Sequence, residues 1–527
     1  MNANNEELPQ LIRSLLKPDV YDHPVTDIQL IETHISWVIL TGEYAYKIKK
    51  PINLGFLDFS TLEKRLFCCN EELRLNSRMA AAIYLEVVPI SGSRELPLLH
   101  GTGDAIEYAV KMVQFPQQAQ LDNMLANGEL GKPHMDAIAQ LVAEFHQSTG
   151  VAADDSYYGD PEHVYQPVAE NFTQIRQHLH TSRYDDQLAG LEHWGKAEFN
   201  SLRPLLEQRK HDGFIRECHG DMHLRNLVWF NGQPLAFDCL EFNPALRWID
   251  TLSEVAFLVM DLQDRKQPQL AQRFLNSYLE QSGDYQGMRV FYFYLAYRAL
   301  VRAKVDAIRA GQQSITDAER REAEEEFYAY LNLALSYTRR RKPKLIITRG
   351  MSASGKSTLT QPLLELMGAI RLRSDVERKR LFGIGPGMES TAEIDKGIYI
   401  VEAGVKTYEK LRLLAQALLE AGITVIVDAA FLKYEQRQLF RELAHQQQVP
   451  FIIAEFTASA DTLRRRISAR TDDVSDADLS VLEHQLASWQ PVDESELTSL
   501  IKIDTETEFD AADLLEEINT LSGNDDA

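Results

Sequence analysis

The chain of 527 residues is too long for a single hydrophobic core, and its ordinary composition, 44% hydrophobic and 25% charged, predicts three or four folded structural units. A formal charge of −23 repels polyanions, which argues against binding along a nucleic-acid strand. Four cysteines, two of them adjacent, argue against a disulfide framework, and the lack of a leader-like start or a long apolar run leads us to expect a cytoplasmic protein without membrane contact.

Short strands are expected near the start of the chain. Residues 27–49 alternate polar and apolar side chains and predict three strands. Lys47 and Lys49 share one face of the third strand, because side chains along a strand alternate with a period of two. They either point into a cleft under the sheet or are solvated at its edge. The next predicted elements are a helix at 60–79, which contains Glu71 and Glu72, a strand at 107–115, and helices at 133–148, 164–180 and 186–210.

Chemically active side chains gather in the stretch 218–226, which contains His219-Gly220-Asp221. The dipeptide Asn231-Gly232 that follows is typical of a two-residue hairpin loop. Counting back from this loop along both strands places Asn226 next to Asp238. Such a group suits a site in which one carboxylate accepts a hydroxyl proton while an amide and the other carboxylate hold Mg²⁺.

This stretch resembles the catalytic machinery of a known fold. Asp221-x4-Asn226 resembles the catalytic loop of kinases. Together with the later Asp238, it resembles the aminoglycoside phosphotransferase and choline kinase branch of the kinase-like fold over most of residues 25–335. The resemblance implies an α+β protein-kinase-like fold for this half of the chain. It also implies that Asp221 is the catalytic base and that Asn226 and Asp238 bind Mg²⁺.

The same resemblance assigns further residues. Ala45-Tyr46-Lys47 matches the end of the third kinase strand, which implies that Lys47 holds the α- and β-phosphates of ATP and that Glu72 or Glu71 pairs with it. Asp250 resembles the family's structural aspartate, which steadies the catalytic loop. No clear glycine-rich phosphate loop stands between the first strands, so the alternative is a degenerate kinase fold retained for binding.

A basic stretch separates the two halves of the chain. Residues 339–344 contain five cations and follow a helical pattern, which Pro343 ends. The cations suit a helix end and a solvated linker, and a lipid or nucleic-acid contact is the alternative. We therefore expect four parts: a kinase-like domain at 1–338, a linker at 339–343, a second domain at 344–510 and an acidic tail at 511–527.

The second domain opens with a complete P-loop, which follows the apolar run 345–348 and precedes a helical pattern at 359–367. In such a loop the backbone N–H groups surround phosphate oxygens, Lys356 reaches the β- and γ-phosphates, and the Ser357 hydroxyl binds Mg²⁺. The predicted nucleotide-binding residues are Gly350, Ser352, Ala353, Ser354, Gly355, Lys356, Ser357 and Thr358.

Strands and helices alternate after the P-loop and predict an α/β fold with a parallel sheet. Asp375 follows the second strand of this pattern, and Asp428 ends the third. At the rim that carries the P-loop, one aspartate can take a substrate proton, while one near Ser357 can orient Mg²⁺, the role expected of Asp428. Either aspartate is alternatively a helix N-cap.

Arginines complete the second predicted site. Arg466 and Arg470 share one face of a predicted helix, from which they can reach the transferring phosphoryl group as a lid; the alternative is an exposed basic helix. With the P-loop and Asp375-x2-Arg378, they resemble small P-loop kinases over about residues 344–505. These relatives are zeta-toxin-like enzymes, chloramphenicol phosphotransferase and polynucleotide 5′-hydroxyl kinases. The resemblance implies that Asp375 is a base and that Arg378 positions phosphate or substrate.

The whole chain resembles an uncharacterised bacterial family in which an aminoglycoside phosphotransferase-like domain is fused to a P-loop kinase. The resemblance implies a bifunctional phosphotransferase that depends on ATP and Mg²⁺, and we expect it to act on hydroxyl groups of small molecules. Two alternatives stay open. In one, a non-catalytic N-terminal domain regulates the P-loop kinase; in the other, the protein phosphorylates nucleic-acid 5′ ends, which its acidity limits to short ends or mononucleotides.

Overall fold

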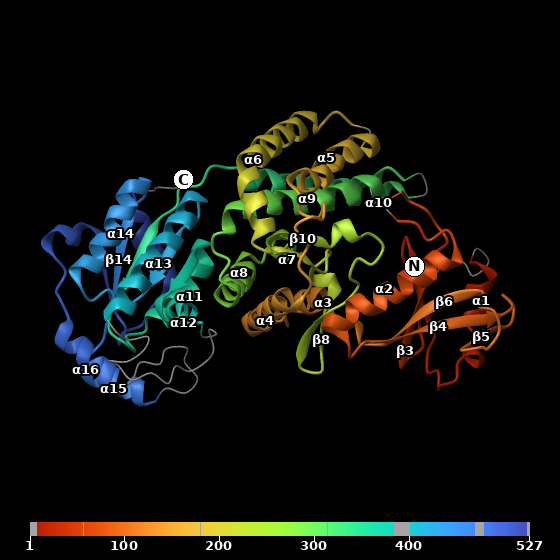
Figure 1. The fold of residues 1–527 in the computed structure, drawn as a ribbon, viewed down its shortest axis with the longest axis horizontal. Helices are drawn as coiled ribbons and strands as arrows, with labels where there is room; N and C mark the ends of the chain where they lie inside the picture. Colours follow the sequence, from red (N-terminus) through yellow and green to blue (C-terminus); the bar gives the residue numbers. More distant parts are fainter. Residues whose placement is uncertain are drawn as a thin grey trace. The chain divides into compact units, whose positions relative to one another are not determined.

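The computed structural model describes residues 8–55, 57–179, 181–312, 315–383, 401–469 and 479–523, with side chains from residue 403 onward in the fifth range. Backbone contacts divide the chain into two compact units (Figure 1). The first unit contains residues 1–167 and 204–261, and the second contains residues 168–203 and 262–527. The units do not separate at the predicted linker, because the helices directly before it belong to the same unit as the P-loop half.

The first unit begins with a six-stranded antiparallel sheet in the order β1-β2-β3-β6-β4-β5. Its strands are β1 (Gln29–Glu32), β2 (Ser36–Leu40), β3 (Tyr44–Lys49), β4 (Tyr84–Gly92), β5 (Pro97–Leu99) and β6 (Glu107–Val113). The predicted strands within 27–49 and at 107–115 are confirmed, whereas β4 and β5 were not predicted. Because β3 lies between β2 and β6, the alternative that its lysines stand at a sheet edge is wrong.

Helix α2 (Leu62–Ala80) packs against β4 and β6. It begins after Thr61, whose side chain accepts a hydrogen bond from the backbone N–H of Lys64 and so caps the first turn. Its buried face combines apolar side chains such as Leu75 with the carboxylate of Glu72. The helix therefore carries a negative charge into the interior of the first unit.

The remainder of the first unit is mainly helical, with two small sheets. The helices are α1 (Gln10–Leu15), α3 (Leu121–Ala126), α4 (Lys132–Ser148), α5 (Pro161–His178), α6 (Asp185–His211) and α7 (Thr251–Asp264), of which the last three cross the unit boundary. β7 (Ile215–Glu217) pairs with β10 (Trp248–Asp250), and β8 (Leu227–Phe230) forms a hairpin with β9 (Gln233–Ala236). The three helices predicted within 133–210 are confirmed.

The second unit contains α8 (Pro268–Ser282), α9 (Met288–Ala310) and α10 (Asp317–Tyr337), and α9 packs along α10. The aromatic side chains of Phe291, Phe293 and Tyr294 on α9 are each 2% exposed and belong to the hydrophobic core. Among the residues that the structure describes, no helix is long and apolar enough to cross a lipid bilayer.

A five-stranded parallel sheet forms the P-loop half, in the order β12-β13-β11-β14-β15. The strands are β11 (Leu345–Arg349), β12 (Ile370–Arg373), β13 (Val425–Asp428), β14 (Phe451–Thr457) and β15 (Leu500–Asp504). The described helices are α11 (Lys356–Met367), α12 (Ser374–Leu381), α13 (Val401–Glu420), α14 (Tyr434–Gln447), α15 (Ala460–Ser468) and α16 (Leu479–Ser488). The predicted parallel α/β arrangement is confirmed, and β11 with its P-loop lies at the centre of the sheet.

The end of the chain corrects one predicted boundary. Residues Ala511–Leu521 form the helix α17, where an acidic tail was predicted. Leu514 and Ile518 of this helix are 4% and 0% exposed and pack in the same core as Leu363 and Leu364 of α11. Acidic residues between these apolar positions give the segment a tail-like composition, although its apolar spacing is helical.

Candidate functional site

Lys47 of β3 lies in a buried group of charges in the first unit. Its Nζ atom lies 2.7 Å from Oε1 of Glu72 on α2 and also contacts the carboxylate of Asp238, which follows β9. Lys49 lies 2.7 Å from the other Glu72 oxygen and pairs with Glu241 as well. The lysine side chains are 11% and 1% exposed, so both point into the protein.

Neighbouring charges of opposite sign keep Lys47 and Glu72 ionised. Burial by itself lowers the pKa of Lys47, but the carboxylates of Asp238 and Glu72 outweigh burial and raise this pKa well above its usual value. Burial also acts to raise the pKa of Glu72, but the two lysines lower it to about 2. A cation held in this way is suited to binding phosphate oxygens.

Glu71, the alternative partner of Lys47, has other contacts. Its carboxylate lies 2.8 Å from a guanidinium nitrogen of Arg74 and 3.4 Å from one of Arg247. The acidic partner of Lys47 on α2 is therefore Glu72, and the alternative assignment to Glu71 is wrong.

The hairpin of β8 and β9 has the predicted register. Asn231 and Gly232 have φ angles of +51° and +81°, as a two-residue turn of this kind requires. The backbone N–H of Phe237 donates to the carbonyl oxygen of Asn226 at 3.0 Å. Asn226 thus lies opposite Phe237 and beside Asp238, which brings two of the predicted residues together.

Asn226 also holds Asp221. Its Nδ2 atom donates to the Asp221 backbone oxygen at 2.9 Å and to Oδ2 at 3.0 Å, while Nε2 of His223 lies 3.3 Å from the same Oδ2. The Asp221 side chain remains 31% exposed. The amide oxygen of Asn226 and the carboxylate of Asp238 are the hard oxygen ligands that Mg²⁺ prefers. This set of donors fits a magnesium site at the base of the hairpin.

His219 connects the loop to the hairpin. Its Nε2 atom lies 2.8 Å from the backbone oxygen of Phe237, and the backbone N–H of Asp221 donates to its Nδ1 atom at 3.3 Å. Burial lowers the pKa of His219, which favours a neutral ring that donates at Nε2 and accepts at Nδ1. The histidine therefore positions the loop and is not itself at the exposed face of the site.

Glu254 of α7 is a residue of this site that was not predicted. Its buried carboxylate accepts hydrogen bonds from the backbone N–H groups of His219 at 3.1 Å and Gly220 at 2.6 Å, and it lies 3.0 Å from Nε2 of His146. Burial acts to raise the pKa of Glu254, but these partners lower it to about 2. An acidic residue within the apolar run 252–260 is a signal that could have identified it, because carboxylates are rarely buried without partners.

Asp250, the residue that the resemblance assigns to steadying the loop, binds an arginine of α6. It ends β10, and its carboxylate forms a two-pronged ion pair with Arg209 of α6, at 2.6 and 2.7 Å. Glu254 lies one helical turn after Asp250 and accepts hydrogen bonds from the loop backbone. Glu254 thus makes loop contacts of the kind that the resemblance implied for Asp250.

The P-loop of the second unit has an unusual backbone at three positions. Gly350 has a φ of +154°, and a Cβ atom there would lie 2.6 Å from the backbone oxygen of Phe456, which leaves no room for a side chain. Gly355 has a φ of +88° and precedes the first turn of α11. Ala353 takes a φ of +63°, which is strained for a residue with a Cβ. Strain of this kind clusters at functional loops.

Lys356, the first residue of α11, folds back over the loop. Its Nζ atom donates to the backbone oxygens of Gly350 at 2.9 Å and Met351 at 2.7 Å. The backbone N–H of Ser352 donates to the side chain of Gln485 on α16 at 2.7 Å. A cation, loop amides and the helix N-terminus thus meet at one point, where they favour an anion.

Ser357 and Asp428 form the second possible magnesium site. The Ser357 hydroxyl donates to Oδ2 of Asp428 at 2.6 Å, and Thr348 lies 3.4 Å from the other oxygen. The hydroxyl and the carboxylate are the two protein ligands that P-loop enzymes use for Mg²⁺, so they fit this ion. Two other residues predicted to bind the nucleotide differ in exposure. Ser354 of the loop is buried, and Thr358 of α11 is exposed.

Asp375 lies near this pair. β12 and β13 pair Arg373 with Asp428, so Asp375 follows the strand position next to Asp428 by two residues. Burial acts to raise the pKa of Asp375, but Arg373, 3.0 Å away, lowers it on balance. The N-cap of α12 is Arg373 and that of α14 is Lys433, so the alternative that Asp375 or Asp428 is an N-cap is wrong.

The predicted arginines have different positions. Arg378 lies one turn after Asp375 on α12, and its charge contributes to the lowered pKa of that carboxyl. Arg466 on α15 contacts the P-loop backbone at Ala353, 3.4 Å away, and donates to Oγ1 and the backbone oxygen of Thr505 at 2.9 and 2.8 Å. Arg470 lies outside the described residues.

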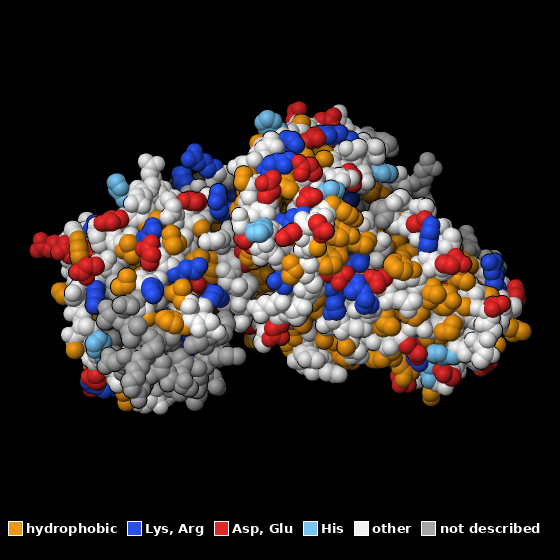
Figure 2. Space-filling model, in the orientation of Figure 1, with side chains coloured by type: hydrophobic (Ala, Val, Ile, Leu, Met, Phe, Trp, Pro, Cys, Tyr) orange, Lys and Arg blue, Asp and Glu red, His pale blue; other side chains and the backbone are white. Residues whose placement is uncertain are grey.

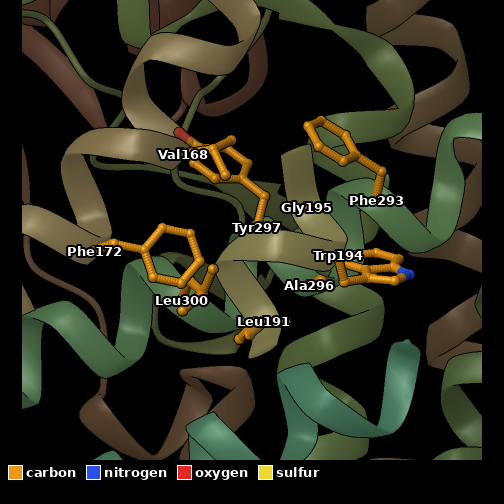
Figure 3. Close-up of a pocket in the computed structure, with 9 residues that line it drawn as sticks. All are labelled: Val168, Phe172, Leu191, Trp194, Gly195, Phe293, Ala296, Tyr297 and Leu300. Carbon is orange, nitrogen blue, oxygen red and sulfur yellow. The ribbon is translucent and has the colours of Figure 1, made fainter. Parts of the chain in front are cut away.

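An apolar pocket of the second unit is unrelated to either group of residues. It has a free volume of about 10 Å³, which is room for roughly one water molecule. Figure 3 shows the side chains that line it, from α5, α6 and α9, and none is a candidate site residue. They are Val168, Phe172, Leu191, Trp194, Gly195, Phe293, Ala296, Tyr297 and Leu300. We interpret this pocket as a packing gap between helices.

Comparisons with known proteins identify a family for each half of the chain. The phosphotransferase enzyme family matches residues 123–291, and the AAA domain family matches residues 345–492. An uncharacterized protein of Mycobacterium tuberculosis H37Rv is 31% identical over 476 residues, which are 89% of this chain and 92% of that protein, and one of Mycobacterium bovis matches equally. The chain belongs to their family. In this chain a phosphotransferase domain is followed by a P-loop domain, as predicted, and the two domains make it a kinase-type protein.

Comparison with solved structures finds kinases at low similarity. A sugar kinase from Janibacter sp. HTCC2649 is 21% identical, with a TM-score of 0.26, over 34% of this chain and 94% of that chain. Choline kinase from Cryptosporidium parvum Iowa II is 12% identical, with a TM-score of 0.39, over 62% of this chain and 94% of that chain. At this level of identity the likenesses concern the fold alone.

Proposed function

We propose that the P-loop half transfers the γ-phosphoryl group of Mg-ATP to a hydroxyl group of a small molecule. The observation that carries this proposal is the 2.6 Å contact between Ser357 and Asp428, at the rim where Asp375 also lies. Ser357 and Asp428 would hold Mg²⁺, which neutralises phosphate charge when bound. Lys356 would bind the β- and γ-phosphates, Asp375 would accept the hydroxyl proton, and Arg378 and Arg466 would stabilise charge near the loop.

We propose a second site of the same reaction class in the first unit. Lys47, held by Glu72, would bind the α- and β-phosphates, and Asn226 and Asp238 would hold Mg²⁺. Asp221 would accept the proton of the acceptor hydroxyl. The support for a catalytic role is that this base and both magnesium ligands lie in hydrogen-bonded contact or directly beside one another. We propose two catalytic domains, a kinase-like one at 1–338 and a P-loop one that extends from 344 through α17, with 339–343 as their linker.

The acceptors are proposed to be small molecules and not long nucleic acids. The net charge of −23 opposes the binding of a polyanion. On the face in Figure 2, acidic and basic side chains of the described residues are intermixed and do not form a continuous basic track. A short 5′ end is the largest nucleic acid that we expect either site to accept.

Four full-length proteins test both proposals: the wild type, Asp221→Asn, Lys356→Ala and the double variant. Labelled phosphate from ATP is followed to a panel of sugars, aminoglycosides, nucleosides and a 5′-hydroxyl oligonucleotide. We expect each single variant to keep transfer to one class of acceptor and the double variant to keep none. Full transfer by Lys356→Ala to every acceptor would reject catalysis by the P-loop half. If Asp221→Asn instead changes nothing, the first unit is a binding module.

A further inference from the structure

Helix α8 precedes the P-loop half by more than sixty residues in the chain. Within the second unit it nevertheless packs against α11 and against β12, the edge strand of the P-loop sheet (Figure 1). Three polar residues spaced four apart, Gln272, Asn276 and Glu280, lie along one side of α8 and face β12. Residues at this spacing share one face of a helix. The stripe therefore runs beside the edge strand of the sheet, toward the end that carries Asp375.

The first two residues of the stripe complete the hydrogen bonding of the edge strand. Gln272 and Asn276 donate to the backbone oxygen of Ala369 at 2.6 and 3.0 Å, and Asn276 Oδ1 accepts the backbone N–H of Arg371 at 2.8 Å. Gln272 and Asn276 are 8% and 3% exposed. A buried edge strand needs such partners, because unpaired backbone groups are costly away from water. Side chains of α8 thus take the place of a neighbouring strand.

The third residue of the stripe reaches the functional rim. Oε1 of Glu280 binds two guanidinium nitrogens of Arg371 at 3.0 and 3.3 Å, and Arg371 also donates to the backbone oxygen of Ser357 at 2.9 Å. Oε2 of Glu280 lies 3.8 Å from Arg373, which in turn binds Asp375 at 3.0 Å. The Glu280 carboxylate therefore lies beside two buried arginines: Arg371, which contacts α11, and Arg373, which binds the candidate base Asp375.

A second contact ties α8 to α12, the helix that carries Asp375. Arg380 of α12 donates to the backbone oxygen of Glu280 at 2.7 Å, near the C-terminal end of α8. A cation at this end of a helix is favoured by the helix dipole. Gly283, with a φ of +77°, ends α8, and a Cβ there would lie 2.7 Å from Arg380. The end of α8 and the last turn of α12 are therefore closely fitted.

We propose that Glu280 is a positioning residue of the P-loop site: it holds Arg371 against the first turn of α11 and shares Arg373 with Asp375. This inference rests on the proposed phosphotransfer by the P-loop half. If the Glu280 charge is removed, Arg373 keeps Asp375 as its main carboxylate partner. Arg373 then pulls the Asp375 carboxylate away from the acceptor hydroxyl. Lys356 itself is held by the backbone oxygens of Gly350 and Met351, so we expect a larger effect at the candidate base than at the phosphates. The loss is therefore expected in kcat rather than in KM for ATP.

The matched control is Arg273 on the same helix. Arg273 lies 3.3 Å from Glu365 of α11, so it contributes an ion pair to the same interface without reaching Arg371 or Arg373. Arg273→Gln removes this pair and reports what the loss of an interface contact alone does. Glu280→Asp, which keeps the charge on a shorter side chain, tests rescue.

The experiment uses full-length Asp221→Asn protein, in which the first unit is silent. It measures the melting temperature, and it measures kcat and KM for ATP for labelled phosphate transfer to the best acceptor of the panel above. We expect Glu280→Gln to lower kcat roughly tenfold to a hundredfold, with KM changed less than about twofold, and Glu280→Asp to recover part of the loss. Arg273→Gln should lower the melting temperature while kcat stays the same. If Glu280→Gln and Arg273→Gln behave alike, Glu280 is only an interface contact and the inference is overturned.

A second readout does not depend on turnover. Amide hydrogen exchange of residues 369–381 should become faster in Glu280→Gln than in Arg273→Gln, because only the former releases β12 and α12 at the rim. If the Asp221→Asn parent shows no transfer at all, it is the proposed function that fails. Exchange then decides the inference: equal exchange in the two variants overturns it, and faster exchange in Glu280→Gln supports it.

Discussion

The two candidate sites hold the lysines that we propose to bind phosphate in different ways. Lys47 is fixed by side chains distant in sequence, Glu72 on α2 and Asp238 after β9. Lys356 is fixed by backbone oxygens of its own loop, at Gly350 and Met351. In the first unit the site depends on buried charges and hence on the tertiary fold, whereas in the second it depends on the local course of the backbone.

The largest expected effect is the loss of phosphoryl transfer by the first unit when its proposed base is replaced. In a Lys356→Ala background, Asp221→Asn should lower phosphoryl transfer by the first unit about 10³-fold, because a general base is lost while the magnesium ligands remain. Asp238→Ala should in addition weaken Mg-ATP binding, since it removes a charged ligand of the metal. Transfer rates and isothermal titration with Mg-ATP check both. Rates indifferent to either change would leave the first unit without catalysis.

Replacing a buried charge of the first unit should also lower the stability of the fold. Glu72→Gln removes the common partner of Lys47 and Lys49, and we expect a loss of about 3 kcal/mol in the free energy of unfolding. Urea unfolding measures it. Glu71→Gln is the matched control, since Glu71 pairs with the half-exposed Arg74, and its cost should stay below about 1 kcal/mol. Equal losses in the two variants would contradict the assignment of Glu72.

The same contrast explains what the sequence could predict. The P-loop could be read from nine consecutive residues, 350–358, because loop and helix start make the phosphate site locally. The Asn231-Gly232 hairpin fixed the register that brings Asn226 beside Asp238, again within a short segment. Glu72 was left open against Glu71, because only the packing of α2 on the sheet decides which of two adjacent carboxylates faces Lys47.

Residues that act across longer distances were missed for the same reason. Glu254 of α7 holds the loop 218–226. Its place in the apolar run 252–260 indicates burial, but it does not say that the partners are the backbone N–H groups of His219 and Gly220. The contact of α8 with β12 joins segments that the sequence assigned to different domains. The α17 helix was assigned as a tail because its acidic composition obscured the spacing of Leu514 and Ile518.

Acid should reveal the dependence of the first unit on Glu254. Its pKa in the folded protein is about 2, below the ordinary value of 4.5, so the ionised carboxylate stabilises the fold above pH 4.5. This stabilisation is lost as the pH falls from 4.5 toward 2. Urea unfolding at a series of pH values should show a steeper acid loss in the wild type than in Glu254→Gln, which is less stable at neutral pH. Parallel curves would show that Glu254 is not held ionised by the loop and His146.

The smallest expected loss of phosphoryl transfer follows from substitutions on α15. This helix carries one arginine that contacts the P-loop and another that forms a surface ion pair. Arg466 binds Thr505 and lies against the P-loop backbone, so Arg466→Ala should lower transfer by the P-loop half about tenfold, by loss of a charge near the phosphates. Arg464, on the same helix, pairs with Glu483 across a solvated surface, with side chains 45% and 55% exposed. Arg464→Ala should change transfer less than twofold and leave the urea unfolding midpoint unchanged. Both variants are measured in the Asp221→Asn background. Because they remove the same side chain from the same helix, equal rates would show that the P-loop site depends only on its own backbone and Lys356, and that the lid role predicted for Arg466 does not hold.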